Sequence, residues 1–425
     1  MSMPNDKDRD LGPDDGPEEK KYSFLQETIK PKPISREHFI NQLARFAIYG
    51  IVLGVFACLG FFALKPWLED QFGEDPKTVT IPEDEEDGGG TDGSQEDSVP
   101  AANADSYEEM MDSMNERAAE ARKGIAAIEP ANAGEDWTKE MTGISTGAAG
   151  VITADNGQEL LILADDFVCE DASEWTVTFQ DGKEYRASLK KRDRNSGLAI
   201  FSVPHGEIKD STWSAIKVSV LGNSNLVKQG DTVMALGNLF GYADGMGYGT
   251  VNTTDYKTTF FDGECGILTT NIPAEEQGTG VLFNMEGQVV GLIPESVWDN
   301  NESSMANAYA ISDLKPIIEF LANGESVPYI GVYGTTVTSE LKEDQGMPGG
   351  VYVVDVDPDS PAMAAGIQSG DIIYAIGNKN VMNIGSYQNT VLKMQTGQQI
   401  TVEGRRIGAE GYVDVEFTVT VGSKE

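Results

Sequence analysis

The chain has 425 residues, of which 31 are lysine or arginine and 69 are aspartate or glutamate, so its formal net charge is −38 at pH 7. A nucleic-acid phosphate backbone would be repelled by this charge, so we expect no nucleic-acid partner. Three cysteines are too few for a disulfide framework. Two histidines, without a CxxC or HExxH motif, leave a zinc site almost without ligands. We therefore expect no metal and no other cofactor.

Residues 46–64 read FAIYGIVLGVFACLGFFAL, nineteen positions without a charge. A helix of that length can cross a bilayer core of about 30 Å. A signal peptide is disfavoured because 45 residues precede the run and no A-x-A-like site follows, and a buried soluble helix is disfavoured because the run is apolar on every side. Basic residues crowd its N-terminal flank. We therefore predict a single-pass cell-membrane protein with a cytoplasmic N-terminus and residues 65–425 outside.

Two segments are predicted to be disordered, the cytoplasmic tail 1–45 and the acidic linker 65–104. Both are rich in charged residues and lack hydrophobic periodicity, and the linker contains the run EDEEDGGGTDGSQEDS. A calcium site in this acidic run is the alternative, but a solvated, self-repelling tether is the preferred interpretation. From Ser106 apolar residues recur at helical spacing, which predicts an amphipathic helix that enters the folded part. These residues are Met110, Met114, Ala118, Ala121 and Ile125.

From about residue 143 the pattern changes to short β-runs separated by turn signals. Hairpin turns are predicted at Asn156-Gly157 and Asp181-Gly182. Many strands at close spacing, with few helices between them, predict a closed β-barrel architecture within residues 105–325. The last block, 326–425, mixes strands with two short helices and is long enough for a separate α+β domain.

The order of these runs resembles the trypsin-like double barrel of HtrA-type serine proteases, and the closing block is similar to the PDZ domain that follows it in that family. The most specific stretch is SPAMAAGIQSGDIIYAI, with Ser360 as helix N-cap, Pro361 at the first helical position and Gly366 at the helix end. The resemblance implies a mostly β chain, in which a single transmembrane helix precedes a trypsin-like double β-barrel and a PDZ domain. It also suggests a homotrimer.

In that family a serine nucleophile, a histidine base and an orienting aspartate form the catalytic triad. By resemblance, Phe167 stands where the histidine is expected, Gly197 stands where the aspartate is expected, and Gly278 replaces the serine. The resemblance therefore implies that all three positions have lost their chemistry and that the chain is a pseudoprotease, not an enzyme.

Relocated catalytic groups are the alternative. A one-residue slip would bring Thr279 to the nucleophile position, but its hydroxyl would still need a base. His205 is expected in a surface turn rather than in a cleft, and a lysine base is not excluded by spacing. Cys169 and Cys265 lack a histidine partner, and the sequence does not decide whether they pair. An active serine-type endopeptidase of envelope protein quality control therefore stays as the alternative function.

The segment Tyr329-Ile330-Gly331-Val332 resembles the loop with which PDZ domains of this family hold a peptide C-terminus. Such domains add the peptide as a strand and bind its carboxylate with backbone N–H groups. Gly331 leaves room for that close approach, although an ordinary edge strand would have the same pattern. We therefore expect a membrane-anchored, proteolytically inactive protein that binds C-termini of envelope or unfolded proteins, for sensing or scaffolding. A structural envelope protein without a peptide ligand is the third alternative.

Overall fold

The computed structural model describes residues 77–84, 104–131, 147–170, 172–241, 244–275, 278–295 and 304–425. The tail 1–45 and the apolar run 46–64 lie outside these residues. Within the described part, no helix combines the length and the apolar character that a membrane crossing requires. The single transmembrane helix therefore stays a prediction from the sequence.

The first described helix, α2, runs over Ala104–Arg122 and confirms the helix predicted from Ser106. Its buried face consists of Met114, Ala118 and Ala121. The predicted apolar stripe is wrong at both ends. Met110 is 50% exposed, and Ile125 lies beyond the helix end, where it begins strand β1 (Ile125–Pro130).

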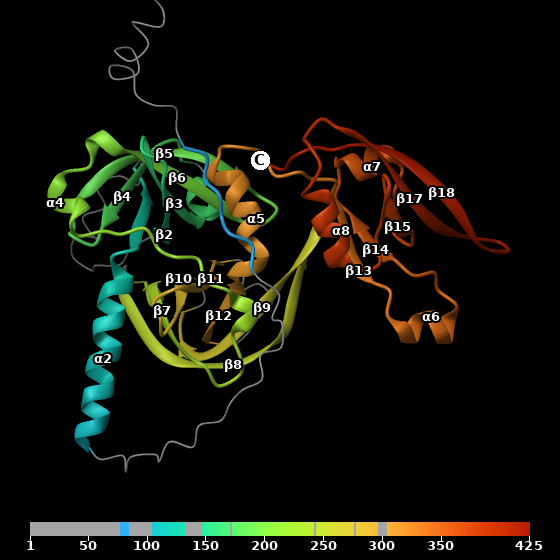
Figure 1. Ribbon diagram of the computed structural model, residues 1–425. Coiled ribbons are helices and arrows are strands. Elements are labelled where there is room, and N and C mark those ends of the chain that lie inside the picture. Colours follow the sequence, from blue (N-terminus) through green and yellow to red (C-terminus); the bar gives the residue numbers. More distant parts are fainter. Residues whose placement is uncertain are drawn as a thin grey trace, which may run out of the picture. The chain divides into compact units, whose positions relative to one another are not determined.

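Six antiparallel strands close the first barrel in the order β1-β2-β3-β6-β5-β4 (Figure 1). After β1 these are β2 (Ala148–Asp155), β3 (Glu159–Asp165), β4 (Trp175–Phe179), β5 (Glu184–Asp193) and β6 (Leu198–Pro204). Both predicted hairpins are confirmed. Gly157 and Gly182 have φ angles of 88° and 73° in the β2–β3 and β4–β5 turns, a region that glycine enters without strain.

A second set of six strands closes the second barrel in the order β10-β11-β12-β9-β8-β7. Its strands are β7 (Thr232–Asn238), β8 (Gly245–Phe260), β9 (Gly263–Pro273), β10 (Thr279–Asn284), β11 (Val289–Ile293) and β12 (Met305–Ala310). Short helical turns connect the strands at η1 (Asp166–Cys169), η2 (His205–Glu207), α4 (Asp210–Trp213) and η3 (Ser224–Leu226). Each barrel has its own apolar core, so the predicted mostly β double barrel is confirmed.

Helix α5 (Ile311–Ala322) follows the second barrel, and residues 77–84 lie extended beside it (Figure 1). The backbone N–H and C=O groups of Val79 each bond to the Asn323 side-chain amide at 2.9 Å. The Lys315 ammonium lies 2.6 Å from the Asp84 carboxylate, and both side chains are largely buried. This part of the linker therefore departs from the expected disorder, because α5 supplies partners for its backbone and its charge.

The last domain is an antiparallel sheet of order β13-β14-β15-β17-β18, with β16 paired to β15. Its strands are β13 (Val332–Thr336), β14 (Val351–Val356), β15 (Ile372–Ile376), β16 (Lys379–Asn380), β17 (Gln399–Gly408) and β18 (Gly411–Thr420). An apolar core formed by residues between 330 and 421 fills it. Strand β13 forms one edge of this sheet.

Three helices belong to this domain, where the sequence predicted two: α6 (Ser339–Gln345), α7 (Pro361–Ala365) and α8 (Ile384–Val391). The predicted ends of α7 are confirmed. The Ser360 hydroxyl accepts a hydrogen bond from the Met363 N–H, and Gly366 ends the helix at φ 88°. Helix α6 was missed because none of its residues is buried, so it has no apolar face to give a periodic signal.

Candidate functional site

Two of the three predicted triad positions lie together at one end of the first barrel. Phe167 is in η1 directly after β3, and its side chain packs against the apolar core of that barrel. Gly197 precedes β6 with a φ of 70°, and its carbonyl accepts a 3.0 Å hydrogen bond from the Asp166 N–H. A phenyl ring and a glycine can neither accept a proton nor orient a base, so these two positions offer no acid–base chemistry.

The third position, Gly278, precedes β10 in the second barrel. A Cβ atom built on Gly278 would lie 2.7 Å from the carbonyl oxygen of Leu239 and 3.0 Å from that of Glu275. Both contacts are with backbone, which cannot turn aside as a flexible side chain can. A serine would therefore require the local backbone to move.

The alternative groups for catalysis are held in other contacts. The Thr279 hydroxyl is buried and accepts a 3.0 Å hydrogen bond from the Ala149 N–H. His205 lies at the opposite end of the β3–β6 pair from Gly197, 43% exposed. Its ring lies 4.4 Å from that of Trp213. The prediction that His205 occupies a surface turn is confirmed.

The two described cysteines are buried free thiols that belong to the cores of different barrels. Burial raises the pKa of the Cys169 thiol to about 11 and that of Cys265 well above its ordinary value. The thiolate is the nucleophilic form of cysteine, so neither residue is activated at neutral pH.

A buried carboxyl group joins the two barrels near Phe167. The Asp165 side chain accepts hydrogen bonds from the Phe167 N–H at 3.0 Å and from the Glu295 N–H at 2.6 Å, the latter beyond the end of β11. Burial raises the pKa of Asp165 to about 7. Asp165 lies two residues before Phe167, close to a predicted triad position. Its hydrogen bonds go to the backbones of two loops, so its carboxyl group links these two loops.

The predicted peptide-binding residues Tyr329, Ile330, Gly331 and Val332 form the loop that leads into β13. We call these four residues the carboxylate loop. Gly331 has a φ of 94°, and a Cβ atom there would lie 2.3 Å from the Cβ of Ser360. The side chains of Ile330 and Val332 are buried in the domain core, so the backbone is the part of the loop that can bind a ligand.

The carboxylate loop already holds a carboxylate, that of Asp262. One Asp262 oxygen accepts hydrogen bonds from the Ile330 and Gly331 N–H groups at 2.6 and 2.7 Å. The other accepts from the Val332 N–H at 3.0 Å and from the Tyr387 hydroxyl of α8 at 2.7 Å. Burial raises the pKa of Asp262, and these four donors oppose that rise because they stabilise the carboxylate. Three backbone N–H groups of this loop thus converge on one carboxylate of the same chain.

Sequence reasoning missed Asp262. It lies in the turn between β8 and β9, where the dipeptide Asp262-Gly263 has the composition of an ordinary turn. No local pattern connects this turn to a loop nearly seventy residues further along the chain.

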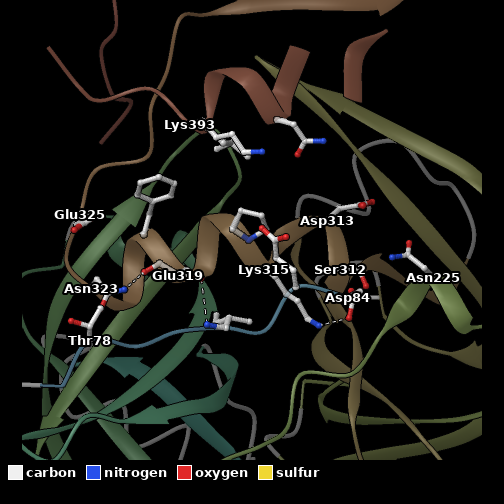
Figure 2. A pocket seen from close by; sticks show the side chains of 16 residues that line it. Thr78, Asp84, Asn225, Ser312, Asp313, Lys315, Glu319, Asn323, Glu325 and Lys393 are labelled. Carbon is white, nitrogen blue, oxygen red and sulfur yellow. Dashed lines mark hydrogen bonds and ion pairs between the residues drawn. The ribbon is translucent and has the colours of Figure 1, made fainter. Parts of the chain in front are cut away.

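A cavity of about 650 Å³ lies between α5, residues 77–84 and α8 (Figure 2). Its lining mixes polar and apolar side chains, and several of the polar ones in Figure 2 bond to one another or to the lining backbone, as Lys315 does with Asp84 and Asn323 with the Glu319 carbonyl. Within the described ranges, no three His, Cys, Asp or Glu side chains gather closely enough to hold a metal ion, in this cavity or elsewhere.

Two family models match the chain. The trypsin-like peptidase domain matches residues 142–292, and the PDZ domain matches residues 328–420. The serine protease Do-like HtrB of Bacillus subtilis (strain 168) is 27% identical over 289 residues, which cover 64% of this chain and 62% of that protein. The serine protease Do-like HtrA of Lactococcus lactis subsp. lactis (strain IL1403) is 25% identical over 325 residues, which cover 71% and 78%.

A probable periplasmic serine endoprotease DegP-like of Halomonas elongata is 27% identical over 281 residues, with 64% of this chain and 56% of that protein covered. The chain thus spans about three fifths of the length of HtrB and of this relative. Among solved structures, the HtrA-type protease AlgW with a decapeptide superposes with a TM-score of 0.51 at 19% identity, covering 73% of this chain and 99% of that one. This likeness shows a shared fold. With both domain models matched in order, the chain belongs to the HtrA-like proteins, in which a trypsin-like peptidase domain precedes a PDZ domain.

Proposed function

We propose that this chain is a membrane-anchored, proteolytically inactive HtrA-like protein that binds peptide C-termini through its PDZ domain. The observation that carries the proposal is the convergence of the Ile330, Gly331 and Val332 N–H groups on one carboxylate. A free C-terminus offers the same group, and hydrogen bonds to an ionised acceptor are about twice as strong as neutral ones. C-termini of envelope or unfolded proteins are the expected partners.

Peptide recognition is tested by titrating the full-length chain with a ten-residue peptide that ends in valine, as the free acid and as the C-terminal amide. The amide lacks the charge that the carboxylate loop binds, so we expect it to bind much more weakly. Equal affinities for the two forms would contradict carboxylate recognition. Binding of neither form, extended to a peptide array without a hit, would favour a structural envelope protein.

The absence of proteolysis is supported by the residues themselves. Phe167 and Gly197 carry no acid or base, and Gly278 is confined by backbone carbonyl groups. Catalysis by the mechanism of the family needs a nucleophile, a base and an orienting carboxylate within hydrogen-bond reach. The named relatives are serine proteases, which keeps an endopeptidase with relocated groups as the alternative.

Casein hydrolysis and labelling with a fluorophosphonate separate these two functions. We expect the full-length chain to give neither signal above that of the Thr279→Ala variant. Hydrolysis that serine-directed reagents inhibit, and that Thr279→Ala abolishes, would establish the rearranged enzyme instead.

The proposed location rests on the apolar run 46–64 and on the basic residues before it. Protease treatment of spheroplasts should remove the PDZ domain and leave the N-terminal tail protected. A protected PDZ domain would mean that the orientation is inverted.

A further inference from the structure

The β8–β9 hairpin reaches from the second barrel into the PDZ domain. We call residues 260–264 the hairpin tip. Strand β8 contacts β13, and β9 contacts α8, so the tip lies where the edge strand and the helix of the PDZ domain face each other (Figure 1). This is the place at which a PDZ domain receives an extended peptide.

The tip makes the two kinds of contact that such a peptide would make, a carboxylate bound by the carboxylate loop and a backbone hydrogen bond to the edge strand. The Asp262 carboxylate takes the three N–H groups of the carboxylate loop, and the Tyr387 hydroxyl binds it from α8. In addition, the Asp262 N–H donates a 2.7 Å hydrogen bond to the carbonyl oxygen of Val332, the first residue of β13. A ligand's last residue pairs with an edge strand through the same type of backbone hydrogen bond.

The residues on either side of Asp262 fill the space around it. A Cβ atom on Gly263 would lie 2.6 Å from the amide carbon of Gln388, so the hairpin backbone lies directly against α8. The Glu264 N–H donates to the Gln388 side chain at 3.2 Å. The Phe261 ring lies edge-on to Tyr333 at 5.9 Å.

The backbone of Asp262 has an unusual conformation, with a φ of 63°. Few residues other than glycine adopt this region, and such a conformation persists where the surroundings hold it in place. Here the surroundings are the carboxylate loop and α8. The buried carboxylate and its positive φ therefore agree in indicating a specific docking contact.

We propose that the hairpin tip is an internal ligand of the PDZ domain, which a peptide C-terminus must displace before it can bind. This inference rests on the proposed peptide-binding function. Two carboxylates cannot share the same three N–H donors, and their charges repel each other. The apparent affinity for a peptide is therefore the intrinsic affinity reduced by the fraction of molecules in which the tip is undocked. Because the tip joins two barrel strands, a bound peptide and a docked barrel hairpin exclude each other.

The test compares the full-length chain with Asp262→Asn, using the valine-ended peptide as free acid and as amide. Asparagine tolerates the positive φ but carries no charge and presents an NH₂ group to the N–H donors. We expect Asp262→Asn to bind the free acid at least about tenfold more tightly than the unchanged chain does, which corresponds to an undocked fraction of about one tenth or less. Asp255→Asn is the matched control, because it removes the same charge from an exposed position of the same hairpin.

The outcomes separate the two proposals. Equal affinities of the unchanged chain and Asp262→Asn, with the free acid still preferred over the amide, would overturn the internal ligand and leave the peptide-binding function standing. Loss of the preference for the free acid in both would overturn the peptide-binding function and the internal ligand with it.

A measurement on the unchanged chain decides the question if Asp262→Asn fails to fold. Hydrogen exchange of the Asp262 amide should become faster when the free-acid peptide saturates the protein, because displacement breaks its bond to Val332. The amide peptide should leave that exchange rate unchanged. Full protection of the Asp262 amide in the saturated complex would overturn the inference.

Discussion

The barrel end at Phe167 and the carboxylate loop at Gly331 differ in the kind of group on which their function depends. Triad chemistry is carried by three particular side chains, and this chain has a phenyl ring and two glycines at the corresponding predicted positions. Carboxylate binding is carried by backbone N–H groups, which every residue except proline possesses. The loop needs only a glycine that leaves the backbone open, and Gly331 is present.

Under the proposed function, this difference explains why the peptidase domain would lose its chemistry while the PDZ domain keeps its binding geometry. A single substitution removes a nucleophile or a base completely. Backbone donors persist through most substitutions, as long as the turn keeps its shape. We therefore expect divergence to remove proteolysis before it removes peptide recognition.

The strongest test that binding depends on the backbone shape of the carboxylate loop is Gly331→Val. Valine would have to adopt a φ of 94° with its Cβ 2.3 Å from the Cβ of Ser360, so the loop cannot keep its shape. We expect affinity for a free-acid peptide to fall at least about 100-fold, which is about 2.8 kcal/mol at 1.4 kcal/mol per factor of ten. Isothermal titration of the full-length chain measures this loss.

Gly370→Val is the matched control for Gly331→Val. Gly370 belongs to the same domain and has a φ of 92°, but a Cβ atom there would meet nothing within 4 Å. The Gly370→Val variant imposes a similar backbone strain without a clash at the carboxylate loop, so the peptide affinity should be largely kept. Similar losses in both variants would mean that strain, and not the carboxylate loop, sets the affinity.

At the barrel end, the pH dependence of stability tests the ionisation state of the buried Asp165 carboxyl group. Burial raises the pKa of Asp165 from its ordinary 3.8 to about 7 in the folded protein. A raised carboxyl pKa contributes stability below pH 3.8 and loses it as the pH rises to about 7. This shift is about three pKa units at about 1.4 kcal/mol each, so the contribution is on the order of 4 kcal/mol.

Denaturant unfolding of the full-length chain and of Asp165→Asn from pH 4 to pH 8 tests this assignment. The stability of the variant relative to the unchanged chain should rise between pH 4 and pH 7 and stay level above. Asp181→Asn is the control, because hydrogen bonds from Thr212 and Lys183 outweigh burial and lower the pKa of Asp181 below its ordinary 3.8, so its difference from the unchanged chain should stay nearly level from about pH 5 upward. A level difference for Asp165→Asn would show that Asp165 is ionised throughout.

Gly278→Ser places a hydroxyl group at the position predicted for the nucleophile. Its Cβ would lie 2.7 Å from the Leu239 carbonyl oxygen, and overpacking of this kind costs about 1 to 3 kcal/mol. We expect a loss of stability of that size and no gain in casein hydrolysis. Gly206→Ser, at a position with nothing within 4 Å, should leave stability nearly unchanged. Hydrolysis by Gly278→Ser alone would mean that a base already lies in place.

The features that sequence predicted well are those decided by a few neighbouring residues. The hairpins at Gly157 and Gly182 and the ends of α7 follow from turn and capping residues that act within four positions. The glycine of the carboxylate loop was found in another way, from the resemblance of Tyr329-Ile330-Gly331-Val332 to the family segment and from the room that glycine leaves for a close approach.

The features that sequence missed depend on partners far along the chain. Residues 77–84 are ordered by Asn323 and Lys315, more than 200 positions away. Asp262 is identified as a ligand only when the hairpin tip and the carboxylate loop are seen together. Such contacts leave no periodic pattern in a single sequence, since neither partner's neighbours signal them.

The smallest expected effect concerns charge around the carboxylate loop. The chain carries a net charge of −38, and Asp357, whose N–H bonds to the Gly331 carbonyl, places one acidic side chain beside the loop. Lys424 pairs with Asp357 at 2.7 Å and offsets part of that charge.

We therefore expect a peptide with two glutamates upstream of its terminal valine to bind only a few-fold more weakly than its glutamine counterpart, at about 0.05 M salt. The Debye length falls to about 3 Å at 1 M salt, so the difference should disappear there, whereas hydrogen bonding to the terminal carboxylate persists in both peptides. A preference for the acidic peptide, or a difference that salt does not change, would mean that local contacts and not the net charge decide between the two.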